Sequence, residues 1–283
     1  MVRILIELVA GGAVAWLVTV RLAHGIAARG PLFRRNYRRL EVAAAAGMAP
    51  VLGALAGIGV VTLIAVFGRP APIAEAAHAL VGAAALLGFA FLGLWDDVAA
   101  SSDVRGWRAH LASIRRGPPT TGAIKLVGGG AIAILIGAAA DHRIAGILLH
   151  AALIASAANV VNLLDLRPGR ACKFFLVPAA GLLILALASG DEVSTILVPV
   201  TVAVIAFCPL DLRERAMLGD AGANALGALL GTVVVHAASD PVEVAVLAAL
   251  AALQVAGERP GLSRLIDIVP PLRRFDRAGR APE

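Results

Sequence analysis

Long apolar runs alternate with short polar segments along almost the whole chain. Nine of these runs approach the roughly 20 residues that an α-helix needs to cross the hydrocarbon core of a bilayer. They cover residues 4–23, 45–67, 75–95, 123–140, 144–162, 173–190, 193–210, 222–238 and 241–256. The pattern therefore predicts an all-α integral membrane protein, a polytopic bundle of about nine to ten transmembrane helices, with residues 1–283 forming a single transmembrane domain.

The composition supports a membrane location. Hydrophobic residues make up 59% of the chain and charged residues 16%, whereas about a quarter of the residues of a soluble domain are charged. The mean hydropathy is +0.86. A net charge of +6 would suggest a nucleic-acid partner in a soluble protein. In this chain we expect the basic residues to set the membrane topology instead, and we predict no nucleic-acid partner.

The basic residues are distributed unevenly between the two sides that the nine runs define. Of the 25 Lys and Arg residues, 22 fall on one side, which the positive-inside rule assigns to the cytoplasm. We therefore predict a multi-pass protein of the cell membrane with its N-terminus outside. The cytoplasmic segments are then residues about 24–44, 96–122, 163–172 and 211–221 and the C-terminal tail 257–283. Basic residues follow the first run where a cleavage site would be expected, so we interpret this run as a retained helix.

Two adjacent acids, Asp96 and Asp97, end the third apolar run on the predicted cytoplasmic side. A carboxylate at a helix C-terminus opposes the helix dipole and is a poor cap. Acidic residues at a membrane span usually mark an ion, a proton path or a substrate. The pair therefore indicates a bound cation, although a solvated helix end remains an alternative.

A second motif, ANVVNLLDLRPGRA, places Asn159, Asn162 and Asp165 at positions i, i+3 and i+6, which predicts that they share one helix face. Arg167 and Arg170 follow around a Pro-Gly break. Amides can contact a base or a sugar, and guanidinium groups suit phosphate. Hydrogen bonds between membrane helices are the alternative role for the amides.

Two further segments carry residues suited to an anion. Asp220 lies in Gly-Asp-Ala-Gly at the start of an apolar run, where a helix N-terminus could offer free N–H groups to an anion, or where Asp220 could simply be an N-cap. Lys125 follows Thr120-Thr121-Gly122 at the entry to another run. This lysine suits a phosphate contact or a snorkelling role, and its surroundings do not match the P-loop spacing.

The combination of these motifs is more specific than any one of them. Four carboxylates are predicted at helix ends on the same membrane side, those of Asp96, Asp97, Asp165 and Asp220. Hard oxygen ligands without a Cys or His cluster suit Mg²⁺. The surrounding basic residues are Lys125, His110, Arg167 and Arg170. Acids, a hard divalent ion and basic side chains at a membrane surface indicate chemistry on a phosphate or diphosphate.

These residues resemble the polyprenyl-phosphate N-acetylhexosamine-1-phosphate transferase superfamily of the glycosyltransferase family 4 type, which includes phospho-N-acetylmuramoyl-pentapeptide transferase. The resemblance rests on DD, NxxNxxD and GDxG, in this order and on one membrane side, and covers residues about 36–231. It implies a glycosyl-1-phosphate transferase of cell-envelope biogenesis, for example in peptidoglycan synthesis. Such an enzyme transfers a sugar-1-phosphate from a UDP-activated amino sugar to polyprenyl (undecaprenyl) phosphate at the inner membrane face, depends on Mg²⁺ and releases UMP.

The resemblance also implies roles for individual residues. The catalytic residues would be Asp96, Asp97 and Asp220, with Asp220 and Asp97 as metal ligands. The substrate-binding residues would be Asn159, Asn162, Asp165, Lys125, His110, Arg167 and Arg170. Two features depart from the family pattern. Pro168 stands where a second acid of the middle motif is usual, and the final cytoplasmic segment contains arginines but no histidine.

These departures keep a second hypothesis open, in which the chain is a non-catalytic membrane relative that binds the lipid carrier or acts as a scaffold. A transporter is disfavoured because the acids lie at the ends of the predicted spans, and no pair of broken helices is present in the pattern. The sequence leaves open which sugar is used, and it leaves open whether the protein is a monomer or a homodimer.

Overall fold

The computed structural model describes residues 2–29, 32–68, 73–99, 120–190, 192–257 and 261–281, and all structural statements refer to these residues. Each of the nine predicted apolar runs is a helix. The long helices are α1 (Val2–Arg29), α2 (Met48–Gly68), α3 (Ile73–Ala99), α5 (Thr121–Ala140), α6 (Ile144–Leu164), α7 (Arg170–Ser189), α8 (Ser194–Leu212), α9 (Gly219–Ala237) and α10 (Asp240–Gly257). The prediction of an all-α polytopic membrane protein is confirmed.

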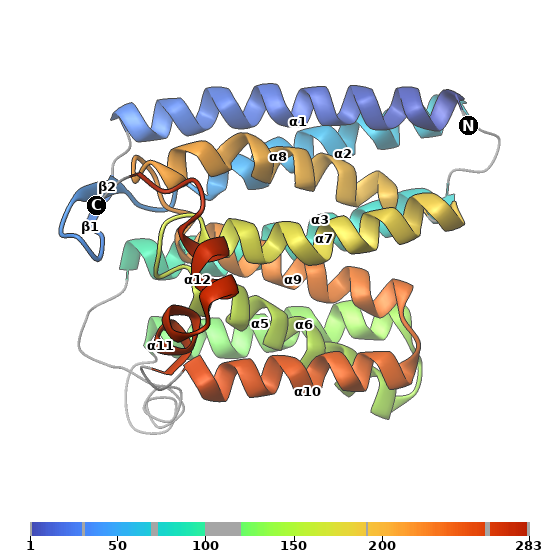
Figure 1. Ribbon diagram of the computed structural model, residues 1–283. Coiled ribbons are helices and arrows are strands. Elements are labelled where there is room, and N and C mark those ends of the chain that lie inside the picture. The colour runs from blue at the N-terminus through green and yellow to red at the C-terminus, as the bar shows by residue number, and fades with distance from the viewer. Residues whose placement is uncertain are drawn as a thin grey trace.

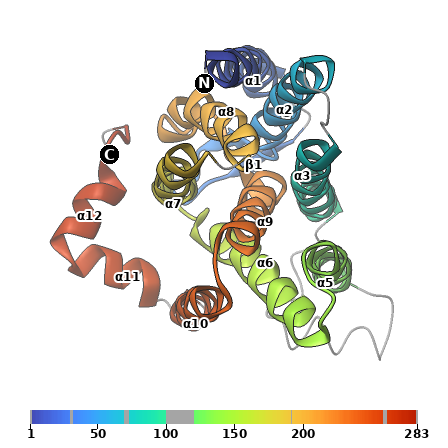
Figure 2. The ribbon, with the colours of Figure 1, turned by 90° about the vertical axis from the view of Figure 1, so that its right-hand side faces the viewer.

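Eight of the described helices are long and apolar enough to cross a membrane, and α9 is the long helix that is not among them. Figure 2 looks along the bundle and shows α9 enclosed by the other long helices. It packs mainly against α3 and α6, and most of its residues are buried. A helix in this position needs no lipid-facing apolar surface, which explains why its polar residues are tolerated.

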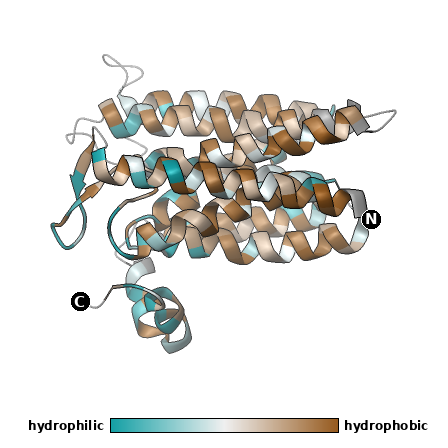
Figure 3. Ribbon diagram, turned by 90° about the horizontal axis from the view of Figure 1, so that it is seen from above, coloured by the Kyte–Doolittle hydropathy of each residue, from teal (hydrophilic) through white to brown (hydrophobic). Residues whose placement is uncertain are grey.

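The long helices run side by side, with the N-terminus at one end of the bundle and the C-terminus at the other (Figure 1). Figure 3 shows that the long helices consist largely of hydrophobic residues, whereas hydrophilic segments gather at the end that holds the C-terminus. We call this the site end, and the other the opposite end. The site end contains the last turn of α3, the connection between α6 and α7, and the start of α9.

Close approach of α9 to its neighbours depends on glycine. A Cβ added at Gly227 of α9 would overlap the backbone of α6 at Ala157, and a Cβ added at Gly93 of α3 would overlap the Asp220 carbonyl oxygen of α9. The small residues therefore bring the helix backbones together, as is common in membrane bundles. The contact at Gly93 also determines where the acids of α3 lie relative to α9.

A two-stranded hairpin lies at the site end, in the segment that the sequence predicted only as a loop. Strand β1 (Phe33–Arg35) pairs antiparallel with β2 (Glu41–Ala43). The Ala43 carbonyl oxygen accepts a hydrogen bond of 3.0 Å from the backbone N–H of Met217, just before α9. The hairpin is thereby joined to the segment that begins α9.

The C-terminal tail, which is too short to fold alone, forms two short helices against the bundle. They are α11 (Gly261–Ile268) and α12 (Pro270–Arg277). Ile266 of α11 packs on a small apolar cluster formed by α6 and α10, which includes Leu164 and Leu250. The predicted cytoplasmic tail is thus a folded part of the site end.

Candidate functional site

The acids of the first and third motifs meet where the last turn of α3 faces the first turn of α9. Asp97 is 4% exposed. One of its carboxylate oxygens accepts a hydrogen bond of 3.3 Å from the Asp220 N–H, and the other accepts one of 3.0 Å from the Ala221 N–H. A carboxylate that opposes the dipole of α3 is therefore placed at the N-terminus of α9, where the helix dipole favours negative charge.

The start of α9 differs from both alternatives that the sequence offered. The N–H groups at its N-terminus are not free for an external anion, because they donate to the carboxylates of Asp97 and Asp165. Asp220 is not the N-cap either, since Leu218 holds that position without a side-chain cap. Gly219 precedes Asp220 with φ of 63°, a left-handed conformation that favours glycine. The Asp220 carboxylate does not cap its own helix and instead forms an ion pair with Lys125.

Asp165 caps the C-terminus of α6 and accepts a hydrogen bond of 2.9 Å from the Gly219 N–H. Burial, followed by the negative charge of nearby Asp211, raises the pKa of Asp165 well above its ordinary value. Because α6 ends at Leu164, Asp165 follows it at the C-cap position. Asp165 therefore lies just past the helix that carries Asn159 and Asn162, and a face shared by all three stays a prediction.

Asp96, the neighbour of Asp97, points to a different set of partners. Its carboxyl group lies beside the side chains of Asp220 and Thr121, and one of its oxygens lies 3.6 Å from the Lys125 ammonium. Lys125 also forms a direct ion pair with Asp220. Lys125 is thus held among the acids and is not a snorkelling residue. With its amide turned to satisfy both neighbours, Asn162 donates to Asp220 at 3.1 Å and accepts from Lys125 at 3.3 Å.

These groups lie at a cavity of about 650 Å³, which we call the Lys125 cavity. Its walls come from α3, α5, α6, α9 and α10. Its polar lining includes Asp96, Lys125, Asn159, Asn162, Asp220, Asn224 and Gln254, and its apolar lining includes Phe89, Leu126, Ala155 and Ala158. Gly129 and Gly130 of α5 also line it, and a Cβ added at Gly130 would meet nothing within 4 Å. Because these glycines have no side chains, α5 leaves space for the cavity.

A second cavity, of about 330 Å³, lies beside the hairpin, and we call it the Tyr37 cavity. Its lining includes Arg35, Asn36, Tyr37, Asp165, Arg167, Pro168 and Asp211. The Arg167 guanidinium lies 4.2 Å from the centre of the Tyr37 ring, a cation–π contact. The two cavities approach each other at the start of α9, because Asp165 of the Tyr37 cavity bonds Gly219, the neighbour of Asp220.

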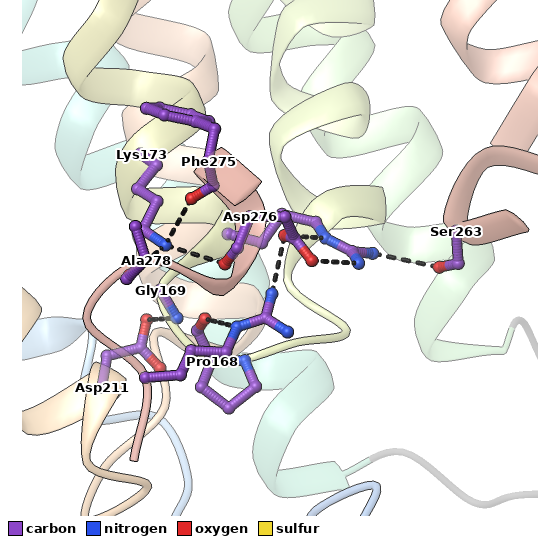
Figure 4. A network of polar contacts seen from close by, with 10 residues as sticks. Pro168, Gly169, Lys173, Asp211, Ser263, Phe275, Asp276 and Ala278 are labelled. Carbon is purple, nitrogen blue, oxygen red and sulfur yellow. Dashed lines mark hydrogen bonds and ion pairs between the residues drawn. The ribbon is translucent and has the colours of Figure 1, made fainter. Parts of the chain in front are cut away.

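One predicted substrate-binding residue, Arg170, does not line either cavity, and another lies outside the described residues. Arg170 is 6% exposed and pairs with Asp276 of α12 through bonds of 2.8 and 3.0 Å (Figure 4). Sequence position alone suggested a phosphate contact for Arg170, but its guanidinium is engaged by the C-terminal tail. His110 lies outside the described residues. The other predicted site residues lie in or between the two cavities.

Three residues that the sequence interpretation did not single out also belong to the site. Arg34 of β1 donates a hydrogen bond of 2.5 Å to the Asp97 carbonyl oxygen. Asn224, one helical turn after Asp220, donates to the Asp220 carbonyl oxygen at 2.5 Å and lines the Lys125 cavity. Asp211 is 3% exposed and accepts a hydrogen bond of 3.1 Å from the Gly169 N–H. Only Asn224, at i+4 from a motif acid, could have been found from spacing.

The described residues contain no group of three or more His, Cys, Asp or Glu side chains arranged to hold a metal ion by themselves. Mg²⁺ is often bound by only one or two carboxylates together with substrate phosphates. Two carboxylates in contact, such as those of Asp96 and Asp220, repel each other when both are charged and are stabilised by a cation. The donor set is therefore compatible with Mg²⁺ that is completed by a phosphate ligand.

The sequence of the chain matches a known protein family. A sequence profile described as Glycosyl transferase family 4 matches residues 77–238, more than half of the chain and all three motifs. The chain belongs to this family. The resemblance drawn from the ordered motifs is thereby confirmed. No curated protein matches the chain.

Membership of glycosyl transferase family 4 indicates a transferase and supports an activity of the polyprenyl-phosphate sugar-phosphate transferase kind. Together with the apolar helices, it suggests a multi-pass membrane protein that meets a lipid carrier in the bilayer. The family 4 match begins in α3 and ends just after α9. It therefore contains Asp96, Asp97, Lys125 and Asp220 and excludes the hairpin and the C-terminal helices.

Proposed function

We propose that this family 4 protein transfers a sugar-1-phosphate from a UDP-activated amino sugar to a polyprenyl phosphate carrier and releases UMP, with Mg²⁺ as cofactor. The site end then faces the cytoplasm, as the excess of Lys and Arg residues on this side predicts. The observation that carries the proposal is the cluster of Asp96, Asp220 and Lys125 at a cavity that also has apolar lining, including Phe89 and Leu126. Such a cavity suits a molecule with an anionic head and a hydrocarbon chain.

In this proposal the lipid phosphate binds in the Lys125 cavity. The Lys125 ammonium neutralises phosphate charge, and the apolar residues Phe89 and Leu126 contact the first part of the prenyl chain. Asn159 and Asn162 line the same cavity, and their amides bind the sugar-phosphate. Gly129 and Gly130 leave room for the chain between α5 and its neighbours.

The nucleotide part of the donor binds in the Tyr37 cavity. Tyr37 offers an aromatic face for stacking with a base, and Arg35 and Arg167 supply positive charge. The hydrogen bond between Asp165 and Gly219 lies between this cavity and Asp220. A diphosphate that extends from the Tyr37 cavity past Gly219 therefore reaches the acids at the Lys125 cavity.

Asp96 and Asp220 are the residues best suited to hold Mg²⁺. Their carboxyl groups contact each other and face the Lys125 cavity. Both oxygens of Asp97 are engaged by backbone N–H groups, so this geometry favours Asp96 over the predicted Asp97 as the partner of Asp220. When bound, the ion would neutralise the charge that develops on the phosphates.

The reaction is a displacement at phosphorus. An oxygen of polyprenyl phosphate forms a bond to the phosphorus that carries the sugar, and the bond from that phosphorus to the UMP oxygen breaks. Catalysis of phosphoryl transfer depends mainly on positioning and charge stabilisation. Lys125 supplies a fixed positive charge between the acids. Asp97 keeps the start of α9, and thereby Asp220, in position.

The test is a UMP exchange assay with purified protein, polyprenyl phosphate, Mg²⁺ and a panel of UDP-sugars. We expect exchange with at least one UDP-amino sugar and loss of exchange after chelation. Asp220→Asn abolishes exchange, whereas Asp240→Asn, a change of the same kind in the first turn of α10 at the opposite end, leaves it intact. Full activity of Asp220→Asn would refute the proposed site.

A separate experiment tests whether the polyprenyl chain binds in the Lys125 cavity. Gly130→Leu places a side chain in open space of the Lys125 cavity, so we expect a higher KM for polyprenyl phosphate and an unchanged KM for the UDP-sugar. Gly59→Leu on α2 is the matched control, because a Cβ there also meets nothing within 4 Å and Gly59 does not line the cavity. Equal effects of the two variants would contradict the assignment.

Pro168 is the observation that supports the alternative of a non-catalytic lipid-carrier binder. It lines the Tyr37 cavity at the position where an acid is usual, and its carbonyl oxygen accepts a hydrogen bond of 3.0 Å from Arg280 of the tail. Binding of polyprenyl phosphate without turnover of any UDP-sugar would favour a lipid-carrier binder over a transferase.

A further inference from the structure

The two C-terminal helices lie across the direction of the long helices. In Figure 2 most of the long helices are seen nearly end-on and α6 is seen obliquely, whereas α11 and α12 are seen from the side and extend outward from α10 past α7. A helix that crosses the bundle direction runs parallel to the plane of a bilayer that the bundle spans. The orientation of α11 and α12 is therefore that of an interfacial helix pair.

Specific contacts hold this pair at the level where membrane spans end. Arg170 is the first residue of α7 and forms two bonds with Asp276 of α12 and one of 3.0 Å with Ser263 of α11 (Figure 4). Lys173, one turn further along α7, donates to the carbonyl oxygens of Phe275 at 2.9 Å and of Asp276 at 2.8 Å. The first turn of a membrane helix thus anchors both short helices near a membrane boundary.

The burial of Asp276 toward the bundle determines how α12 presents its other residues. At about 100° per residue, Leu272 and Phe275 lie on one flank of α12, and Arg273 and Arg277 lie on the opposite flank. All four are exposed. Exposed Leu265 and Ile268 continue the apolar surface on α11. We call the exposed residues Leu265, Ile268, Leu272 and Phe275 the apolar strip.

The exposed charges of α11 and α12 are mostly positive. Four exposed arginines belong to it, Arg264, Arg273, Arg274 and Arg277, and within the described residues no ion pair engages any of them. Of the two acids on these helices, Asp276 is 5% exposed and already paired, because the hydrogen bonds of Arg170 and the charge of Arg280 outweigh burial and hold its pKa below its usual value. Asp267 is the remaining exposed acid.

We propose that α11 and α12 form a binding surface for anionic phospholipid on the site-end leaflet. The apolar strip enters the boundary of the acyl chains, and the arginines contact headgroup phosphates. The in-plane orientation, the anchoring at the start of α7, and an apolar strip beside exposed arginines are the features expected of a helix pair that binds an anionic lipid surface. This role is independent of the transferase proposal, because none of these residues lines either cavity.

The test compares hydrogen exchange of residues 261–277 in the full-length protein reconstituted in nanodiscs. One set contains phosphatidylcholine alone, and the other contains phosphatidylcholine mixed with phosphatidylglycerol. We expect slower exchange in the anionic nanodiscs, and we expect high salt to remove the difference because the attraction is screened. Equal exchange in both nanodiscs, or a difference that resists salt, would overturn the proposal.

Two double variants test whether the arginines of α12 cause the slower exchange in anionic nanodiscs. Arg273→Gln with Arg277→Gln should reduce the effect of phosphatidylglycerol on exchange by about fivefold for each arginine removed. Arg213→Gln with Arg215→Gln is the matched control, because it removes two exposed charges at the site end outside these helices, and it should keep the full effect. An equal loss in both variants would show a general charge effect and refute the surface.

The apolar strip is tested with Ile268→Ser and Leu272→Ser together, which should speed exchange in both kinds of nanodisc. Far-ultraviolet circular dichroism and thermal unfolding check that each variant is folded. If a variant loses α12, the salt response of the wild-type protein still decides the question. Protection that follows protein concentration in detergent, without lipid, would instead identify a contact between two copies of the chain and contradict the proposal.

Discussion

Acidic side chains gather at both ends of the helical bundle, but their partners differ. At the opposite end, Asp141 accepts three hydrogen bonds from the Arg143 side chain, Asp240 lies 3.2 Å from the same arginine, and Glu243 lies 3.1 Å from His150. At the site end, Asp96 and Asp220 share the single ammonium of Lys125. Three acids therefore share two bases at the opposite end, whereas at the site end Asp96 and Asp220 share one base and the adjoining acids Asp97 and Asp165 accept hydrogen bonds from backbone N–H groups.

The pKa values of two acids just outside the membrane spans reflect this difference in partners. Hydrogen bonds from Arg143 hold the pKa of Asp141 well below its usual range, whereas burial and the charge of Asp211 raise that of Asp165. A paired acid is stable as an anion without further ligands, and a clustered acid favours either a proton or a bound cation. The difference indicates that the opposite end is structural and that the site end is arranged for a ligand.

After Asp220→Asn, the largest loss of activity is expected at Asp96. Asp96→Asn should lower the rate of UMP exchange by about 10³-fold, the upper range for removal of one electrostatic contact to a transition state. Stability should change little, because Lys125 keeps its ion pair with Asp220 when the charge of Asp96 is removed. Exchange kinetics and chemical unfolding in detergent check both parts. A stable variant with full activity would remove Asp96 from the site.

A smaller loss of activity is expected when the spacing of α3 and α9 changes. In Gly93→Ala the new methyl group overlaps the Asp220 carbonyl oxygen, so the acids of the two helices separate. A displacement of this kind can reduce a catalytic rate by about 10²-fold. Gly25→Ala is the control, since a Cβ there meets nothing within 4 Å. Equal activities of the two variants would show that the close approach is unimportant.

The opposite end should respond in stability and not in activity. His150→Leu leaves Glu243, which is 3% exposed, without its basic partner. Loss of one member of a buried pair costs about 3 kcal/mol of unfolding free energy. Equilibrium unfolding in detergent measures this loss, and UMP exchange at a permissive temperature should stay at the wild-type rate. A selective loss of exchange would show that this end takes part in the chemistry.

Asp97→Asn should lower both the stability and the activity of the protein, because Asp97 joins α3 to the start of α9. An asparagine offers one acceptor oxygen in place of two, so one of the N–H groups of Asp220 and Ala221 loses its bond. The expected cost is about 2 kcal/mol of unfolding free energy, with a reduced exchange rate. If Asp97→Asn were fully stable but inactive, a direct role in the reaction would replace the positioning role.

The smallest effect is expected at Arg143, which is exposed at the opposite end. Exposed ion pairs contribute little to stability because solvent screens them. Arg143→Gln should therefore change neither the thermal midpoint nor the exchange rate beyond experimental error. A clear loss of either would show that the paired acids of this end are more than a local surface network.

The sequence predicted the helices more completely than the contacts of the site. The nine apolar runs all became helices, and the three acidic motifs were correctly assigned to one end of the bundle. The hairpin β1–β2 was missed, because its two strands of three residues are too short to show an alternating pattern. The C-terminal helices were missed because their stability depends on contacts with Arg170 and Lys173, about 100 positions earlier in the chain.

The sequence by itself determined that this is a family 4 membrane protein with its acids at one end, because helix length, polarity and charge are local properties of the chain. Only the tertiary structure decided how these acids divide their roles. Asp97 caps α9, Asp96 contacts Asp220 beside Lys125, and Arg170 turns away to Asp276. Neighbouring residues point in different directions on a helix, so their partners depend on which elements pack alongside. That packing is set by close contacts such as the one between Gly93 and Asp220.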